Sequence, residues 1–384
     1  MKTVTIIALH LAYGGIEKAV TELANLLAEW YNVHIFSVYD MPNAPAYPLD
    51  ERVTVTYLLK DIPNRAELQD ALSKKDPAGI AREGVRAAKI LYEKRLSVIR
   101  LIRSIGNGIV ITTRDEHNVL LSRYGRSGVL KIAQLHQDHG NDPALLRHFQ
   151  KDYGGIDVFT LLSPKMEREV KSIMGKNRHT KVLYIPNFME TLPEKPEMAK
   201  KEKTVLAAGR LHPVKGFDRL IDLFCEVHDA RPDWNLTILG GGEEEQALLK
   251  KIRENRAEGF ITLAGRRSPE EVSQEMAHAS VYALTSYSEG FPFVLLEAMS
   301  CCLPIAAFDT RGGLDMLVKD GENGFLVTEK QAFVNSLLRL TGEDDLREKM
   351  AARSRSLSEQ FTRDTVKETW FRLIEEYNAD GKGK

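Results

Sequence analysis

The sequence predicts a soluble α/β protein built from two doubly wound domains in tandem. The chain has 384 residues, more than one ordinary hydrophobic core organises. Short runs rich in β-branched residues alternate with stretches of helical periodicity, an order that implies parallel sheets covered on both faces. A charged segment with two prolines, residues 189–203, interrupts this alternation as an interdomain linker would, and the alternation then restarts.

Each predicted domain is a series of strands separated by helices. In the first domain, residues 1–188, a strand leads through Gly14 and Gly15 into an amphipathic helix. The strands expected there are 4–10, 33–38, 53–58, 108–112, 130–136, 157–163 and 181–187. The strands expected in the second domain, residues 204–361, are 204–208, 236–240, 260–265, 281–286, 304–309 and 324–327, and the pattern over 331–379 is helical. Ligands of such sheets bind at the carboxyl ends of strands, so residues that follow strands are the functional candidates.

Composition narrows the class of protein. Hydrophobic residues make up 43% and charged residues 28%, as in globular chains, and no apolar run approaches the ~20 residues that span a bilayer. The start of the chain lacks the small-residue cleavage site of a signal peptide. Three cysteines, Cys225, Cys301 and Cys302, show no metal-ligand spacing, which favours a reduced, cytoplasmic setting.

Charge is spread unevenly along the chain. Residues 1–187 hold 26 Lys/Arg and 20 Asp/Glu, whereas the remainder holds 27 and 34. Two interpretations are open: a basic half that faces an anionic partner, and two halves with ordinary solvated surfaces.

Two cations follow the first strand of the second domain. Arg210 and Lys215, in GRLHPVKG, suit a phosphate-bearing ligand, because Arg binds phosphate oxygens with two donors and Lys adds a compact charge. The glycines of LGGGEEEQ, residues 240–242, allow close backbone approach before a helix. Taken alone, the first motif could also be a surface loop with two solvated cations, and the second could be a common glycine-rich turn between a strand and a helix.

The stretch SYSEGFPFVLLEAMSCCLP, residues 286–304, holds two acids in an otherwise small or apolar run. Its turn places Glu289 in the loop after a strand and Glu297 about one turn into a helix that begins near Phe293. The helix N-terminus would attract a diphosphate, with Glu297 accepting hydrogen bonds from a ribose and Glu289 from a sugar ring. Alternatively, Glu289 caps the helix and Glu297 is solvated, although apolar neighbours leave Glu297 in need of a polar partner.

Together these motifs resemble the retaining glycosyltransferases of the GT-B fold, specifically glycosyltransferase family 4. The E-x7-E stretch carries the main likeness. GGIEKAV, VLYIPN, GRLHPVKGFDRLI and DGENGFLV resemble, in order, the family's glycine turn, the last strand of its first domain, its phosphate-binding segment and the loop and strand after its nucleotide site. The resemblance covers nearly the whole chain. It implies two Rossmann-like domains facing a cleft, with residues 362–384 forming a helix that crosses back to the first domain.

The resemblance implies a role for each matching residue. Arg210 and Lys215 would bind the donor diphosphate, Glu297 the ribose and Glu289 the donor sugar. The other donor contacts it implies are backbone N–H groups of Gly290 and Phe291 at the sugar, backbone near Phe293 at the phosphates, backbone around Arg267 at the base, and Gly15 at the diphosphate from the first domain.

One residue departs from the family pattern, because Cys302 stands where the family usually has glycine. A side chain there would shift the turn behind the nucleotide helix without removing a group that has an assigned role. The vicinal Cys301 and Cys302 are read either as a redox or metal-binding pair or as two small buried hydrophobes.

The chemistry expected needs no metal ion. No D-x-D sequence, the usual anchor of a diphosphate-bound cation, occurs in the chain. Arg210, Lys215 and the helix N-terminus would neutralise the departing diphosphate by preorganised electrostatics. The resemblance also implies that the anomeric configuration is retained, and no cofactor is expected beside the nucleotide sugar.

The acceptor side rests on a histidine. His136 ends a predicted strand in LKIAQLHQDHG, where the resemblance places a histidine near the donor sugar and the acceptor. We therefore count His136 with Glu289, Arg210 and Lys215 as catalytic, although a strand-end histidine is often structural. Asp138 and His139 are further candidates for acceptor contacts.

Residues 74–103 hold nine Lys/Arg and three acids, with apolar residues at broadly helical spacing. Such a helix either lies on anionic lipid or packs on the sheet with its basic face in solvent.

We expect a metal-independent, retaining glycosyltransferase of polysaccharide and cell-envelope biosynthesis. It would move a hexose or N-acetylhexosamine from a UDP-sugar to a lipid-linked, teichoic-acid-like or other cell-surface glycan. The alternatives are a GDP-sugar donor, a phosphorylase or epimerase, and a non-catalytic nucleotide-sugar-binding module. No nucleic-acid partner is expected, because aromatic residues are sparse in the basic half. The expected location is the cytoplasm, and the inner face of the plasma membrane if residues 74–103 bind lipid.

Overall fold

The protein, described by a computed structural model, divides into two compact units. The structure describes residues 2–140, 142–197, 200–310 and 312–379. The first unit comprises Met1–Ile185 with Lys367–Lys384, and the second comprises Pro186–Val366. For comparison, the sequence analysis placed the first domain at 1–188, the linker at 189–203, the second domain at 204–361 and the last helix at 362–384. Of these, residues 1, 141, 198–199, 311 and 380–384 lie outside the described residues.

The first unit contains a seven-stranded sheet in the order β3-β2-β1-β4-β5-β6-β7, with every neighbouring pair parallel. Its strands are β1 (Thr3–Ala8), β2 (Asn32–Tyr39), β3 (Thr54–Leu59), β4 (Gly108–Thr112), β5 (Val129–Gln134), β6 (Val158–Leu161) and β7 (Lys181–Tyr184). Its helices are α1 (Gly15–Leu27), α2 (Arg65–Ser73), α3 (Pro77–Ser104), α4 (Asp115–Tyr124), α5 (Pro143–Lys151), the 3-10 turn η1 (Tyr153–Gly155) and α6 (Pro164–Ile173). The predicted doubly wound parallel sheet is confirmed.

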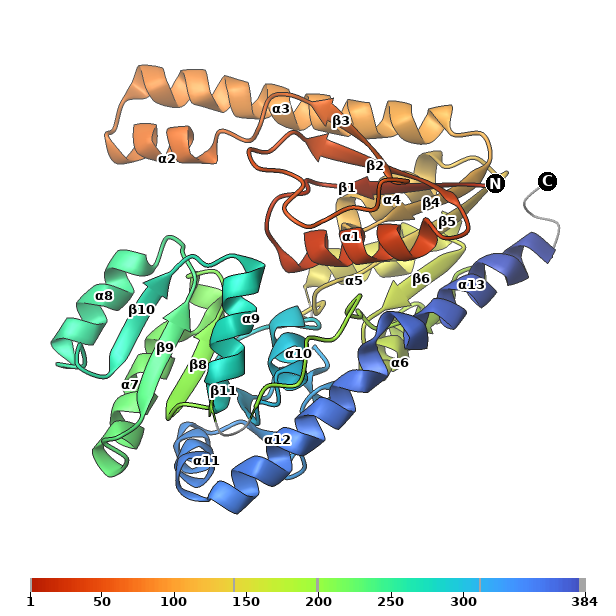
Figure 1. Ribbon diagram of the computed structural model, residues 1–384. Helices are drawn as coiled ribbons and strands as arrows, with labels where there is room; N and C mark the ends of the chain where they lie inside the picture. Colours follow the sequence, from red (N-terminus) through yellow and green to blue (C-terminus); the bar gives the residue numbers. More distant parts are fainter. Residues whose placement is uncertain (1, 141, 198–199, 311, 380–384) are drawn as a thin grey trace. The chain divides into compact units, whose positions relative to one another are not determined.

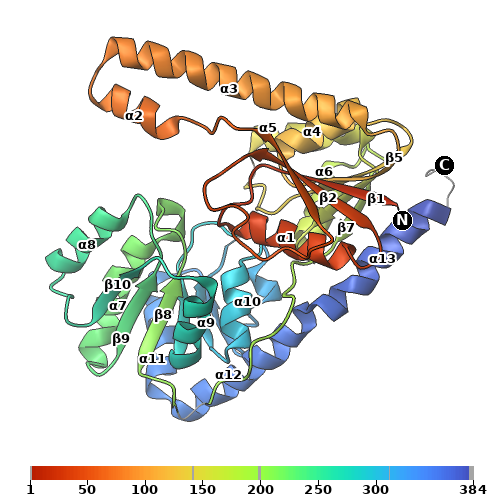
Figure 2. The same cartoon turned by 45° about the horizontal axis from the view of Figure 1, so that its top comes forward.

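Helices cover both faces of this sheet, which is why its central strands are almost wholly apolar. In Figures 1 and 2, α3 and α4 lie on one face and α1 on the other. Ile90 of α3, Leu121 of α4 and Phe149 of α5 pack with Ile7 of β1 in one buried cluster. The last helix, α13 (Arg363–Ala379), belongs to the first unit from Lys367 onwards. There Phe371 packs on Trp30 and Glu375 accepts a hydrogen bond from Tyr31.

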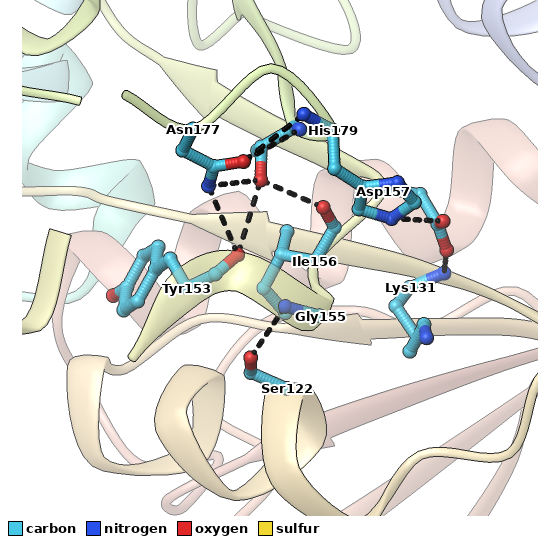
Figure 3. A network of polar contacts seen from close by, with 9 residues as sticks. Ser122, Lys131, Tyr153, Gly155, Ile156, Asp157, Asn177 and His179 are labelled. Carbon is cyan, nitrogen blue, oxygen red and sulfur yellow. Dashed lines mark hydrogen bonds and ion pairs between the residues drawn. The ribbon is translucent and has the colours of Figure 1, made fainter. Parts of the chain in front are cut away.

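A polar network ties the amino-terminal ends of β5, β6 and β7 together (Figure 3). Asp157, just before β6, accepts a hydrogen bond from the Lys131 backbone N–H at 2.9 Å and lies 3.1 Å from His179 Nε2. Thr180, just before β7, donates to the carbonyls of Tyr153 (3.0 Å) and Ile156 (2.8 Å). These contacts fix one edge of the sheet by pairing its polar atoms within the protein.

The second unit contains a six-stranded parallel sheet in the order β10-β9-β8-β11-β12-β13. Its strands are β8 (Thr204–Ala208), β9 (Asn235–Leu239), β10 (Ile261–Gly265), β11 (Val281–Leu284), β12 (Ile305–Phe308) and β13 (Gly324–Val327). Its helices are η3 (Pro213–Lys215), α7 (Phe217–Ala230), α8 (Glu245–Glu254), α9 (Pro269–His278), α10 (Phe293–Ser300), η4 (Leu314–Met316), α11 (Lys330–Gly342), α12 (Asp344–Ser358) and η5 (Glu359–Phe361). Phe224 of α7, Phe333 of α11 and Phe308 of β12 belong to its main core cluster.

The end of α10 explains why glycine would suit the position of Cys302. Cys302 has a left-handed backbone, with φ of 57°. Its N–H donates to the carbonyl of Met299, and the N–H of Leu303 donates to that of Ala298, which is the Schellman pattern at a helix C-terminus. Glycine adopts this conformation without the steric cost that a Cβ brings.

The vicinal cysteines are buried and free of disulfide bonds. Burial raises the pKa of both the Cys301 and the Cys302 thiol, which opposes formation of the reactive thiolate. The structure therefore favours the interpretation of this pair as small buried hydrophobes.

We predict that Cys302→Gly is more stable than Cys302→Ala, the reverse of the usual order of these residues in a helix. Both variants lose the thiol, so their difference isolates the cost of a Cβ at positive φ, about 1 kcal/mol in the free energy of unfolding. Urea denaturation of the two variants measures it. An alanine variant at least as stable as the glycine variant would contradict the assignment of strain to this residue.

Candidate active site

The loops that follow two neighbouring strands of the second unit bring a cation and a carboxylate into contact. Strands β8 and β11 pair in the sheet, Lys215 follows the first and Glu289 the second. Lys215 Nζ lies 2.6 Å from Glu289 Oε1, and Ser286 Oγ donates to the same oxygen at 2.5 Å. The side chains of Lys215 and Glu289 are 23% and 10% exposed, so the pair is shielded but still reachable from solvent.

The backbone beneath this pair is held by Thr285. Its hydroxyl donates to the carbonyl of Gly216 at 2.9 Å, and its own carbonyl accepts from Arg219 Nε at 2.8 Å. Gly216 has φ of 62°, and a Cβ there would lie 2.3 Å from the Thr285 oxygen. The loop after β11 therefore closes onto the loop after β8 only because residue 216 has no side chain.

Arg219 completes this junction. Its guanidinium donates to the carbonyls of Thr285 and Ser286 and lies 4.0 Å from the ring centroids of both Tyr287 and Phe308. Cation–π contact with two rings and hydrogen bonds to two carbonyls fix the guanidinium between α7 and the loop. Arg219 thus orients the segment that carries Glu289 without being placed to bind a ligand itself.

Both predicted acids lie near the hydroxyl of Tyr282. This hydroxyl, on β11, is 3.1 Å from both the N and the O of Ala208 at the end of β8. Burial raises the pKa of Tyr282, and the carboxylates of Glu297 and Glu289 raise it further. Both carboxylates therefore act electrostatically on the hydroxyl that meets the end of β8.

The helix that carries Glu297 begins as the sequence predicted. α10 starts at Phe293, and its N-cap residue, Pro292, makes no side-chain capping hydrogen bond. Glu297 is half-buried in the second turn, between the buried Leu296 and Ala298. An uncapped helix N-terminus offers N–H groups and a positive dipole end to an anion.

The other predicted donor residues lie around these strand ends. Arg210 is exposed and forms no ion pair with any residue that the structure describes. Gly290 is buried, and a Cβ on Gly312 would lie 1.6 Å from the Glu289 carbonyl, so a further loop packs on this turn. Phe291 is buried, and its ring packs on that of Phe361. Arg267 lies exposed after β10.

The three glycines after β9 serve packing between loops. Gly240 N donates to the carbonyl of Gly265, and the Gly241 carbonyl accepts from Leu211 N. A Cβ on Gly240 would lie 1.9 Å from the Gly209 carbonyl oxygen, and one on Gly242 would lie 2.2 Å from the Leu211 carbonyl oxygen. Backbone approach between the loops after β8, β9 and β10 is thus a sufficient reason for glycine here.

The candidates of the first unit lie at the carboxyl ends of its central strands. His136 follows β5 and is half-buried, and burial lowers its pKa to about 4, so its imidazole is neutral near pH 7. His139 is buried and its Nε2 lies 3.0 Å from Glu169 Oε2. Gly15 is exposed, and a Cβ there would meet nothing within 4 Å. The fold of this unit alone therefore does not require glycine at position 15.

The sequence analysis missed a buried ion pair beside these residues. Glu17 is 4% exposed, and its Oε1 accepts from Arg114 Nη2 at 2.9 Å and lies 3.5 Å from His10 Nδ1. Glu17 also explains Gly14, because a Cβ on residue 14 would lie 2.0 Å from Glu17 Oε2. His10 and Arg114 each follow a strand, so the strand-end rule applied to the first half would have found them.

Two further findings concern metals and membranes. Over the described ranges, no group of three or more His, Cys, Asp or Glu side chains is arranged to hold a metal ion. In the same part of the chain, no helix combines the length and the apolarity needed to cross a membrane. The metal-independent mechanism stays a prediction.

Comparison with known proteins gives the class to which this fold and site point. The family model for "Glycosyl transferases group 1" matches residues 188–357, which contain Arg210, Lys215, Glu289 and Glu297. A protein of Haemophilus influenzae named as an uncharacterized glycosyltransferase is 29% identical over 93% of this chain and 95% of its own length.

A second relative has a more specific name. The GtfA subunit of the UDP-N-acetylglucosamine–peptide N-acetylglucosaminyltransferase of Streptococcus pneumoniae is 29% identical, over 76% of this chain and 62% of its own length, so this chain spans less than two thirds of it. The crystal structure of pneumococcal O-GlcNAc transferase GtfA with UDP and GlcNAc superposes with a TM-score of 0.77 and 18% identity, over 98% of this chain and 99% of that one.

Fold and matches together support a glycosyltransferase of the GT-B fold. Residues 188–357 match the glycosyl transferases group 1 model, and the fold of two parallel α/β units is shared with the GtfA structure. The finer expectations of family 4, retention and a UDP-sugar donor stay predictions.

We predict that Gly216→Ala lowers the midpoint of urea-induced unfolding, whereas Gly15→Ala leaves it unchanged. At residue 216 a Cβ combines positive φ with a contact to the Thr285 carbonyl, which costs at least about 1 kcal/mol. At residue 15 the Cβ meets nothing, so the change stays within about 0.5 kcal/mol. Equal midpoints for the two variants would show that the junction with Thr285 is not constrained as described.

Proposed function

We propose that the protein is a retaining, metal-independent glycosyltransferase that moves a hexose or N-acetylhexosamine from a UDP-sugar to a glycan acceptor. The observation that carries the proposal is the contact of Lys215 with Glu289 at the strand ends of the group 1 domain. A cation and a carboxylate held in one shielded place can serve the two parts of a nucleotide sugar, its diphosphate and its sugar ring.

The diphosphate is the group whose charge grows in the transition state. Lys215, the exposed Arg210 and the uncapped N-terminus of α10 offer it positive charge, fixed in place by the junction at Thr285. Electrostatic stabilisation of this kind replaces the cation that other transferases bind. The bond between the anomeric carbon and the phosphate oxygen breaks, and the nucleoside diphosphate leaves. The acceptor oxygen bonds to the anomeric carbon from the same face and gives its proton to the departing phosphate.

Glu289 has a different part in the proposed reaction. Its Oε1 is engaged by Lys215 and Ser286, whereas Oε2 has no hydrogen-bond partner among the described residues. Oε2 is therefore available to accept a hydrogen bond from a sugar hydroxyl. When the diphosphate binds Lys215, the carboxylate keeps its hydrogen bond from Ser286 and so stays oriented.

UDP-GlcNAc is the first donor to test. The relative GtfA is named for transfer of N-acetylglucosamine from UDP-N-acetylglucosamine, and its structure holds UDP and GlcNAc. The base is expected to meet backbone near Arg267 more than side chains, so a GDP-sugar is the alternative donor.

The acceptor is proposed to bind the first unit beside His136. Because the imidazole of His136 is neutral, one of its nitrogens can accept a hydrogen bond from an acceptor hydroxyl and the other can donate one. Glycans of the cell surface remain the proposed acceptors, and cytoplasmic synthesis of such polymers the proposed setting.

The helix α3 supports a membrane-bound acceptor. It packs on the sheet through Ile90, Val98 and Ile102, yet Val85, Leu91 and Tyr92 are 73%, 58% and 64% exposed. A helix that only packs on a sheet has no reason to present large apolar side chains among basic ones. Apolar residues that enter a lipid surface and basic residues that meet anionic headgroups account for both features.

We predict that Lys215→Gln weakens binding of the nucleotide sugar at least tenfold, because a charged hydrogen bond to the diphosphate is lost. Lys203→Gln is the matched control, since Lys203 precedes the same strand and also forms an ion pair, with Asp233. Titration calorimetry with UDP-GlcNAc, UDP-glucose and GDP-mannose measures the affinities. Unchanged affinity in Lys215→Gln would remove the donor-site assignment.

We predict that the wild-type enzyme releases nucleoside diphosphate from its donor sugar at an unchanged rate when EDTA is present. The charge of the leaving group is met by side chains and helix N–H groups, so no metal ion is needed. Coupled detection of UDP, with and without added Mg²⁺ or Mn²⁺, tests this. Activity that appears only with a divalent cation would overturn the metal-independent mechanism.

We predict that the protein floats with phosphatidylglycerol vesicles at low salt and that Val85→Ser with Tyr92→Ser abolishes flotation. Both side chains are exposed, so the double variant should keep its circular dichroism spectrum. Arg95→Gln with Arg100→Gln should weaken binding at least roughly tenfold, unlike Lys250→Gln with Arg253→Gln on α8. Absence of the wild-type protein from the vesicle fraction would leave α3 as a packing helix only.

A further inference from the structure

Buried polar atoms without partners gather at one edge of the first sheet. Among the described residues, nine buried side-chain N and O atoms have no hydrogen-bond partner, and seven of them follow β1, β4 or β5. These seven atoms are His10 Nδ1, Thr113 Oγ1, Arg114 Nε, both ring nitrogens of His117, His136 Nδ1 and Asp138 Oδ1. Native proteins pair such atoms with protein, water or ligand, so a cluster of them needs an occupant.

The opposite edge of the same sheet shows the contrast. There, in the network of Figure 3, Asp157 accepts a hydrogen bond from the Lys131 N–H, and Asn177 donates one to the Thr180 hydroxyl, which itself donates to a carbonyl. None of the buried side-chain atoms of Asp157, Asn177 and Thr180 lacks a partner. The chain therefore satisfies its polar groups where the sheet is only structural. At the carboxyl edge, where parallel α/β sheets bind ligands, it leaves them open.

Arg114 lies at the centre of this carboxyl-edge cluster. It follows β4, which lies between β1 and β5 in the sheet, and its charge adds to the burial that lowers the pKa of His10, His117 and His136. Its Nη2 donates to the buried Glu17, while its Nε has no partner. One side of the guanidinium is thus fixed by the protein and the other is left for another group.

The cluster has hydrogen-bonding capacity but no excess positive charge. Glu17 balances Arg114, and burial keeps the imidazoles uncharged by lowering the pKa of His117 and His136 to about 4 and that of His10 below its usual value. Asp138 adds an acceptor oxygen. Donors and acceptors without net positive charge suit hydroxyl groups, whereas a phosphate needs cations that are free to meet it.

We propose that Thr113, Arg114 and His117 form, with His136, a binding site for the hydroxyl groups of an uncharged saccharide acceptor. The proposal rests on the proposed function and narrows it. The group entering this edge is a sugar ring, and any phosphate of a polymer or lipid carrier lies outside the cluster.

Thr113 gives the sharpest test, because Thr113→Val keeps the shape of the side chain and removes only the open hydroxyl. The variant should raise the KM for the acceptor about tenfold, which corresponds to the loss of one hydrogen bond. Its thermal midpoint should not fall, since a buried hydroxyl without a partner does not stabilise the fold. Thr113→Ser should restore the acceptor KM.

Methyl glycosides of the common hexoses and N-acetylhexosamines serve as acceptors, and sn-glycerol 3-phosphate serves as the charged comparison. Thr160→Val is the control, because Thr160 is equally buried in this sheet and its hydroxyl already donates to the Ala133 carbonyl. We expect transfer to at least one methyl glycoside and not to glycerol phosphate.

Transfer only to glycerol phosphate would overturn the proposal. An acceptor KM of Thr113→Val equal to that of the wild type would also overturn it. If neither the methyl glycosides nor glycerol phosphate accept sugar, saturation-transfer NMR tests whether the methyl glycosides bind. Absence of a signal from all of them also overturns the proposal. Failure of the wild type to bind or hydrolyse any nucleotide sugar would instead contradict the proposed function, so the two failures are distinguishable.

Discussion

The candidate donor site depends on one close approach, between the carbonyl of Thr285 and the backbone of Gly216. The Thr285 hydroxyl donates a hydrogen bond to the Gly216 carbonyl in the loop after β8, and the Thr285 carbonyl accepts one from Arg219. Because a Cβ at residue 216 would lie 2.3 Å from that carbonyl, the loops can meet only at glycine. Lys215 and Glu289 are the neighbours of this junction, so their contact follows from backbone geometry rather than from mutual attraction alone.

The two sheets use their edges differently. In the second unit, glycines let the loops after β8, β9 and β10 hydrogen-bond to one another, and Arg210 and Arg267 on these loops are exposed. In the first unit, buried side chains with open hydrogen-bonding atoms gather instead, around Arg114. Loops joined by backbone hydrogen bonds and bearing exposed cations suit a diphosphate. A cluster of individual side chains suits a partner that differs from one protein to the next.

Much of this could be predicted from the sequence, because it depends on local pattern. Runs of apolar residues predicted each sheet, and the turn before Phe293 fixed the start of α10 and the positions of Glu289 and Glu297. The rest depends on contacts between distant residues. Glu17 and Arg114 are 97 positions apart and Arg219 and Thr285 66, so neither pairing has a local signature. The left-handed conformation of Cys302 was visible only as a departure from glycine, without its cause.

The contrast between Gly14 and Gly15 separates structure from function within one dipeptide. A Cβ at Gly14 would lie 2.0 Å from Oε2 of the buried Glu17, so a side chain there would displace the carboxylate that holds Arg114. Gly15 faces open space, so nothing within its own unit selects against a side chain there. If a larger residue at position 15 harms activity while the unit stays folded, the harm must come from something that approaches the turn from outside. The first glycine of the pair is thus tied to the buried ion pair of its own unit, whereas the fold of that unit leaves the second open to substitution.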